Sequence, residues 1–175
     1  MKTIGLLGGM SWESTVSYYQ LINQQVKETL GGLHSAKISM RSVDFQQIET
    51  LQHQGDWQQL ATILANEAKL VEAGGADGLL ICTNTMHKVA NQVSEAISIP
   101  LLHIADATAK ELITDGVKTV GLLGTKFTME QDFYKGRLTE KYGLNVLVPD
   151  DKSQDIVHQV IYQELCLGQV KDESR

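Results

Sequence analysis

Residues 77–87 read Asp-Gly-Leu-Leu-Ile-Cys-Thr-Asn-Thr-Met-His, an apolar run that ends in a cysteine and three small polar residues. So short and apolar a run predicts a strand over residues 77–82 that is buried on both faces of a parallel sheet. The polar residues after it predict a helix that continues to about Ile97. Cys82 is therefore expected at the carboxyl end of a central strand, where open α/β sheets bind ligands.

Strand and helix patterns alternate on both sides of this segment. The expected strands cover residues 3–7, 36–43, 77–82, 99–104, 117–123 and 144–148. The expected helices cover residues 11–30, 56–73, 83–97, 105–115, 128–142 and 155–167. Such alternation predicts an α/β fold whose parallel strands are joined by right-handed helical crossovers.

A short repeat indicates two related halves. The tetrapeptide Gly-Leu-Leu-Gly occurs at residues 5–8 and again at residues 121–124, 116 residues later. It predicts two similar parallel-sheet α/β domains related by internal duplication, at residues 1–104 and 105–175. The counterpart of Cys82 would then lie at about position 198, so we expect the second domain to be incomplete, truncated before its own cysteine motif.

The composition is typical of a globular cytoplasmic protein. Apolar residues make up 42% of the chain and charged residues 21%, which argues against disorder. The formal charge is −6 and no run of Lys or Arg occurs, so nucleic acid is not an expected partner. We find no signal peptide and no stretch that predicts a membrane span. With two cysteines, we expect reduced thiols rather than a disulfide framework.

Cys82 and the three residues after it form the strongest candidate site. The helix expected here would direct backbone N–H groups and a partial positive charge at the thiol, which would lower the thiol pKa. Thr83, Asn84 and Thr85 add small polar groups able to hold a carboxylate or another anion. The pattern also fits a buried small hydrophobic residue followed by an ordinary helix cap, and the residues alone leave both interpretations open.

Two turns are expected at the same ends of their strands. The glycine pair at residues 8–9 precedes Met10, and glycine lets the backbone approach a ligand closely. The glycine spacing fits neither the dinucleotide-binding fingerprint nor the P-loop. Thr125 occupies the corresponding turn of the second half and would point into a cleft shared by the two halves. Each turn could equally be a plain connection between strand and helix.

The remaining reactive side chains give weaker signals. His87, five residues after Cys82, could form the Cys–His pair of a cysteine nucleophile, or it could cap or pack the start of the helix. Cys166 falls inside an expected helix, away from any strand end, and is interpreted as structural. No group of residues has the spacing of a metal site, so we predict no metal.

Two segments resemble the aspartate/glutamate racemase family of cofactor-independent, two-cysteine amino-acid racemases. Residues 5–15, Gly-Leu-Leu-Gly-Gly-Met-Ser-Trp-Glu-Ser-Thr, are similar to its Gly-Gly-Met loop. Residues 82–87, Cys-Thr-Asn-Thr-Met-His, are similar to its first cysteine motif, Cys-Asn-Thr followed soon by His. The order of strands agrees over essentially the whole chain.

The resemblance implies a chemistry and a set of roles. It implies an active site between two α/β domains, an amino-acid substrate, a homodimer, and neither pyridoxal phosphate nor a metal. One cysteine thiolate removes the α-proton and a second cysteine thiol returns a proton on the opposite face. By position, Cys82 would be one acid/base, residues 83–85 would bind the carboxylate, and Met10 and Thr125 would line the cleft.

The sequence departs from the family pattern in two ways. The second cysteine motif, typically Gly-Cys-Thr-Glu, is not found, so a chain of this length is expected to be unable to racemise by the two-base route. Acid-specific members carry basic residues at two positions where this chain has Gln47 and either Leu165 or Cys166. We therefore expect Gln47 to contact the substrate, and the specificity to be broad and to include neutral amino acids.

Two other functions are open at this point. Decarboxylases and cis–trans isomerases of similar fold also use cysteines at strand ends, although they need no partner for an ammonium group. The other alternative is a non-catalytic truncated fragment or ligand-binding remnant.

Overall fold

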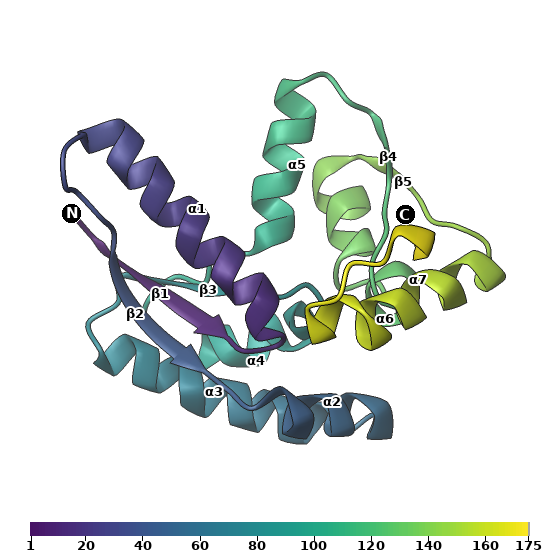
Figure 1. The fold of residues 1–175 in the computed structure, drawn as a ribbon, viewed down its shortest axis with the longest axis horizontal. Helices are drawn as coiled ribbons and strands as arrows, with labels where there is room; N and C mark the ends of the chain where they lie inside the picture. Colours follow the sequence, from purple (N-terminus) through teal and green to yellow (C-terminus); the bar gives the residue numbers. More distant parts are fainter. Residues whose placement is uncertain (175) are drawn as a thin grey trace. The chain divides into compact units, whose positions relative to one another are not determined.

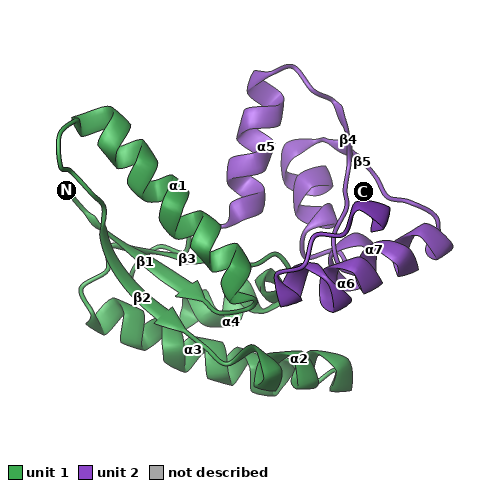
Figure 2. Ribbon diagram, viewed as in Figure 1, with its two compact units in different colours: residues 1–102 green, residues 103–175 purple. Residues whose placement is uncertain are grey.

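The chain divides into two units between Leu102 and His103. In this computed structural model, which describes residues 1–174, unit 1 is Met1–Leu102 and unit 2 begins at His103 (Figure 2). We had expected the boundary between residues 104 and 105. Each unit has its own group of buried apolar side chains, so each is described by itself.

Unit 1 is built on a parallel sheet, which confirms the predicted α/β class. Its strands are β1 (Thr3–Gly8), β2 (Lys37–Ser42) and β3 (Gly78–Ile81), in the order β2-β1-β3 (Figure 1). In this register, Leu7 of β1 lies opposite Arg41 on one side and Ile81 on the other. The carboxyl ends of β1 and β3 therefore lie side by side.

The strand expected over residues 99–104 is reduced to a single parallel bridge between Leu79 and Leu101. At the start of this segment the backbone N–H groups bond to a side chain. One oxygen of Glu72 accepts from the N–H of Ser98, at 2.9 Å, and from that of Ile99, at 3.2 Å. Pro100 has no N–H to donate to a ladder. The expectation of a full fourth strand was wrong, although the bridge still gives β3 a neighbour on its outer side.

The helices of unit 1 pack on both faces of the sheet. They are α1 (Trp12–Leu30), α2 (Phe45–Gln54), α3 (Trp57–Ala73) and α4 (Ala90–Glu95), the last preceded by the 3₁₀ helix η1 (Thr85–Val89). In Figure 1, α1 lies over one face of the sheet and α3 over the other. Asp56 caps α3 by accepting from the N–H of Gln59 at 3.0 Å. Helix α2 was not predicted, whereas the bounds of α3 were.

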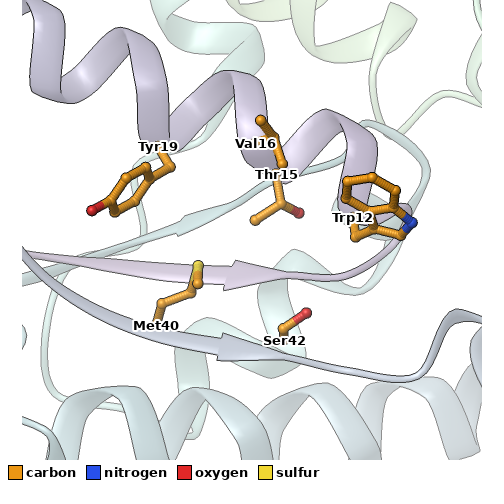
Figure 3. A pocket seen from close by; sticks show the side chains of 6 residues that line it. All are labelled: Trp12, Thr15, Val16, Tyr19, Met40 and Ser42. Carbon is orange, nitrogen blue, oxygen red and sulfur yellow. The ribbon is translucent and has the colours of Figure 1, made fainter. Parts of the chain in front are cut away.

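The apolar residues that recur at helical spacing on α1, from Tyr19 to Leu30, are not fully buried. Tyr19 and Leu30 are each about half exposed, and Thr15 is the buried residue of the helix. A shallow hollow of about 290 Å³ lies between α1 and β2 (Figure 3), lined by Trp12, Thr15, Val16, Tyr19, Met40 and Ser42. None of the side chains predicted for the site lines it.

Unit 2 has a shorter sheet of two parallel strands. Its elements are α5 (Ile104–Thr114), β4 (Thr119–Gly121), α6 (Lys126–Glu130), the π-helix η2 (Arg137–Lys141), β5 (Asn145–Leu147), α7 (Asp151–Gln163), and the 3₁₀ turns η3 (Leu165–Leu167) and η4 (Asp172–Ser174). The single helix expected over residues 128–142 is wrong, because the backbone becomes extended at Gln131. Internal duplication stays a prediction.

An ionic cluster holds η2 to α5 inside unit 2. The Asp106 carboxylate accepts from Arg137 Nη2 at 2.8 Å and from Lys141 Nζ at 2.9 Å. The hydrogen bond from Arg137, together with the neighbouring Lys141, holds the pKa of Asp106 well below its usual range. These hydrogen bonds join η2, which carries Arg137 and Lys141, to Asp106 of α5.

Within residues 1–174, no helix is both long and apolar enough to cross a membrane. Over the same residues, no three His, Cys, Asp or Glu side chains gather as metal ligands would.

Candidate functional site

Cys82 lies where the sequence places it, directly after β3 and beside the end of β1. Its backbone N–H donates to Leu7 O at 2.9 Å, which extends the pairing of the two strands by one residue. The residue has no exposed surface within its unit. The thiol therefore sits at the carboxyl edge of the sheet and below its surface.

Burial raises the pKa of the Cys82 thiol to about 12, whereas we had predicted a lowered value. The expected α-helix after Cys82 is instead a five-residue 3₁₀ helix that begins at Thr85. So short an element supplies little of the aligned dipole on which the prediction relied. The cost of charging a sulfur away from water therefore dominates, and the resting group is a neutral thiol.

The turn after Cys82 is held through its carbonyl groups. The Ser14 hydroxyl lies 2.8 Å from the Cys82 carbonyl oxygen, and 2.9 Å from that of Ser11. The His87 ring nitrogen Nδ1 lies 2.8 Å from the Thr83 carbonyl oxygen. The backbone N–H of His87 donates to Asn84 O at 3.0 Å. Three consecutive carbonyl groups thus have partners inside unit 1.

Side chains of α2 and α3 also contact η1. The Lys88 ammonium lies 3.8 Å from the centre of the Trp57 ring, a cation–π contact. The Gln52 amide nitrogen lies 2.9 Å from Met86 Sδ. These contacts hold the polypeptide just beyond the candidate site in one conformation.

The glycine turn at the end of β1 packs against protein atoms. A Cβ at Gly8 would lie 2.4 Å from Thr15 Cγ2, and one at Gly9 would lie 2.3 Å from Val43 O. Gly9 has φ of 89°, and its N–H donates to Thr15 Oγ1 at 2.9 Å. Both glycines are required by close packing of α1 and the chain after β2, which agrees with the plain connection that was one of our two interpretations.

The other predicted residues of unit 1 occupy different environments. Thr83 is half-buried and Asn84 is exposed, while Thr85 is buried at the start of η1. Met10 belongs to the hydrophobic core and is 3% exposed, so its side chain does not present an open surface within unit 1. Gln47 is exposed on α2.

Thr125 lies in unit 2, at the N-cap of α6. Its hydroxyl oxygen is 3.3 Å from Thr128 Oγ1, and 3.4 Å from the Thr128 backbone nitrogen, from which it accepts. The residue caps a helix, as one of our two interpretations expected. Its predicted place in a cleft with Cys82 stays a prediction.

Cys166 lies in η3 and is partly exposed. It is not at a strand end, and the helix α7 that was expected to contain it ends at Gln163.

Sequence reasoning missed Ser14 and left the role of His87 open. Ser14 contacts the Cys82 carbonyl across a separation of 68 residues, and no local pattern signals such a contact. His87 was noticed for its distance from Cys82 along the chain, but its bond is to Thr83. The spacing of four residues that lets a side chain reach back to a carbonyl was the available signal.

Comparisons with known proteins agree on one family. The sequence profile described as Asp/Glu/Hydantoin racemase matches residues 7–175. The chain is 29% identical over 106 residues to the broad-specificity amino-acid racemase RacX of Bacillus subtilis (strain 168). That match covers 61% of this chain and 45% of RacX, so it spans less than half of that relative's length.

Two crystal structures are similar over nearly the whole chain. A candidate Asp/Glu racemase from Yersinia pestis is 56% identical, with a TM-score of 0.90, and the match covers 99% of this chain and 76% of the other. An aspartate racemase homologue from Pyrococcus horikoshii OT3 is 36% identical, with a TM-score of 0.82, over 99% of this chain and 75% of the other.

Proposed function

Because the chain belongs to the Asp/Glu/hydantoin racemase family, we propose that it acts in the racemisation of amino acids, with Cys82 as one of two acid/base groups. The observation that supports this most directly is the position of Cys82. It combines the strand-end location of a ligand site in an α/β sheet with a turn whose carbonyl groups are held inside the protein. A packing cysteine would require burial but not this arrangement around it.

The proposed reaction moves one proton off the α-carbon and another onto it. The Cys82 thiolate takes the α-proton and becomes a thiol, and the electron pair stays on the α-carbon, delocalised into the carboxylate. Backbone N–H groups of residues 83–85 bind the carboxylate and stabilise the charge that develops there. A second acid then protonates the opposite face, which gives the other enantiomer. The chemistry uses thiols and we propose no cofactor.

The neutral resting thiol suits one direction of this reaction and constrains the other. As a thiol, Cys82 is ready to donate a proton. To accept a proton, Cys82 must first ionise, and its pKa of about 12 opposes ionisation. The α-ammonium group of a bound amino acid brings a positive charge, which favours the thiolate. We therefore propose that the substrate itself promotes ionisation of Cys82.

We assign the second acid/base to no residue of this chain. Cys166 is the one other cysteine, and it lies in a 3₁₀ turn rather than at the end of a strand. By the two-base scheme, Cys82 alone would exchange the α-proton of one enantiomer without forming the other. We therefore expect the chain to exchange the α-proton of one enantiomer only.

We propose that the substrates include neutral amino acids. Where acid-specific racemases place a basic residue, the chain has Gln47, which is exposed on α2 and carries no charge. The similarity to a racemase of broad specificity supports the same conclusion. We further propose a cytoplasmic homodimer that has neither nucleic acid nor membrane as a partner.

The test is α-proton exchange in D2O, followed by NMR. The purified chain is incubated separately with the L- and D-forms of homoserine, methionine, aspartate and glutamate. We expect exchange of one enantiomer, reduced at least about 100-fold by Cys82→Ala. Cys166→Ala is the matched control and should retain the exchange.

Each other result removes part of the proposal. No exchange from a folded chain would favour the non-catalytic fragment or ligand-binding remnant. Full racemisation that is lost in Cys166→Ala would show that the second base was wrongly excluded. Exchange of aspartate alone would refute the neutral, broad specificity.

A further inference from the structure

Three consecutive peptide groups after β3 have their carbonyl oxygens fixed from within unit 1. Ser14 holds the carbonyl of Cys82, the His87 side chain holds that of Thr83, and the His87 backbone holds that of Asn84. Two of the three contacts come from His87. His87 itself is buried, at 3% exposed, whereas Thr83 is half-buried.

The orientation of the carbonyl groups fixes the orientation of the N–H groups. The peptide bonds that follow Cys82 and Thr83 are trans, and in a trans peptide the N–H points opposite to the carbonyl of the same plane. The carbonyl held by Ser14 therefore sets the N–H of Thr83, and the carbonyl held by His87 sets the N–H of Asn84. Among the backbone–backbone hydrogen bonds that residues 1–174 make in turns and loops, neither of these two N–H groups is a donor.

We propose that His87 is a positioning residue, which aims the N–H of Asn84 and its neighbours at the carboxylate of the bound amino acid. This rests on the function proposed above. In this role the imidazole acts through the Thr83 carbonyl, by preventing that peptide from rotating when a negative charge approaches.

The contact also defines the state of the imidazole ring. A carbonyl oxygen only accepts hydrogen bonds, so Nδ1 of His87 must carry the proton. Because Nδ1 is committed to Thr83 O, only Nε2 could serve as the basic nitrogen of a Cys–His pair.

Three variants separate this role from general packing. In His87→Asn, the amide NH₂ can take the place of Nδ1–H, whereas His87→Leu fills the space without a donor. His53→Leu is the matched control, because Nδ1 of His53 also lies near a carbonyl four residues back, that of Glu49 at 3.1 Å, but on the exposed helix α2. Circular dichroism and thermal melting establish that each chain is folded.

The readout is binding of L-methionine compared with L-methioninamide, which keeps the ammonium group and lacks the carboxylate. We expect the wild type and His53→Leu to prefer methionine, and His87→Leu to lose about tenfold of that preference. His87→Asn should recover most of it. The ratio of two affinities does not depend on the fraction of folded protein, so partial unfolding of a variant cannot imitate the effect.

The outcomes distinguish a failure of this inference from a failure of the proposed function. If the wild type prefers methionine and His87→Leu keeps the full preference, the positioning role is wrong while the amino-acid site stands. If the wild type binds neither compound, the proposed function falls, and this inference falls with it.

A second measurement tests the contact without any ligand. Long-range ¹H–¹⁵N NMR of the imidazole should show that Nδ1 of His87 carries a proton. The opposite tautomer would overturn the inference, because Nδ1 could not then donate to Thr83.

Discussion

The pKa of Cys82 is the property on which the proposed chemistry depends most, and it can be measured directly. Burial raises it from 9.0 to about 12. At pH 8 the thiolate fraction of an unshifted cysteine is about one in ten, and that of a group with a pKa of about 12 is about one in ten thousand. Because alkylating reagents attack the thiolate, Cys82 in the folded chain should react about a thousandfold more slowly than in the unfolded chain.

The assay is alkylation by iodoacetamide from pH 7 to pH 10 in the variant Cys166→Ser, where Cys82 is the one remaining thiol. The same variant in urea supplies the unshifted reference. Steric protection and a raised pKa both slow the reaction, but they give different pH profiles. A raised pKa makes the rate climb tenfold per pH unit throughout this range, whereas steric protection alone leaves the plateau near pH 9.

A plateau near pH 9 in the folded chain would refute the burial argument, and only a plateau well below pH 9 would restore the activated thiolate predicted from the sequence. The same shift has a consequence for stability, because the folded state keeps the Cys82 proton at a pH where the unfolded state has lost it. Its contribution is fully present below about pH 9 and is lost as the pH rises toward about 12, a change of at most about 4 kcal/mol. Cys82→Ala should remove this part of the alkaline destabilisation.

Two further predictions concern the packing of Gly9 and the ionic cluster of Asp106. Gly9→Ala should lower the free energy of unfolding of unit 1 by about 2–4 kcal/mol in urea, because a Cβ would lie 2.3 Å from Val43 O at a φ of 89°. Gly121→Ala in unit 2, where a Cβ would have nothing within 4 Å, should change the free energy of unfolding of unit 2 by less than about 1 kcal/mol. Equal effects would contradict the close packing. Asp106→Asn should cost unit 2 about 1–3 kcal/mol by weakening its bond to Arg137. Since that bond holds the carboxyl pKa well below its usual range, the advantage of the wild type should shrink as the pH falls below about 4, and an advantage that is unchanged between about pH 5 and about pH 2 would refute the ionic role.

The local pattern of the sequence was sufficient for the strands and helices nearest the site. The apolar run before Cys82 forms β3, and α3 begins and ends where Asp56 and Gly74 predicted. These signals act within one turn or one strand, through capping hydrogen bonds and the burial of consecutive apolar side chains. The position of Cys82 at the carboxyl end of a strand followed from the same local pattern.

Regular elements failed where distant groups supplied the hydrogen bonds. The segment after Ser98 makes a single bridge to β3 in place of a full strand, and the N–H groups at its start bond to Glu72, which lies 26 residues before Ser98. The stripe on α1 has helical spacing, yet Tyr19 is half exposed. Spacing along a helix defines a face, and the presence of a partner for that face depends on the rest of the fold.

The sequence by itself determined where the candidate site lies: at a cysteine that ends a strand, with small polar residues after it. Only the tertiary structure decided how that cysteine behaves. Its pKa rises because surrounding side chains remove water from the sulfur, and its turn is oriented by Ser14, which is distant in sequence, and by the ring of His87. Solvation and hydrogen-bond geometry depend on every group that packs around an atom, and no local pattern of residues contains that information.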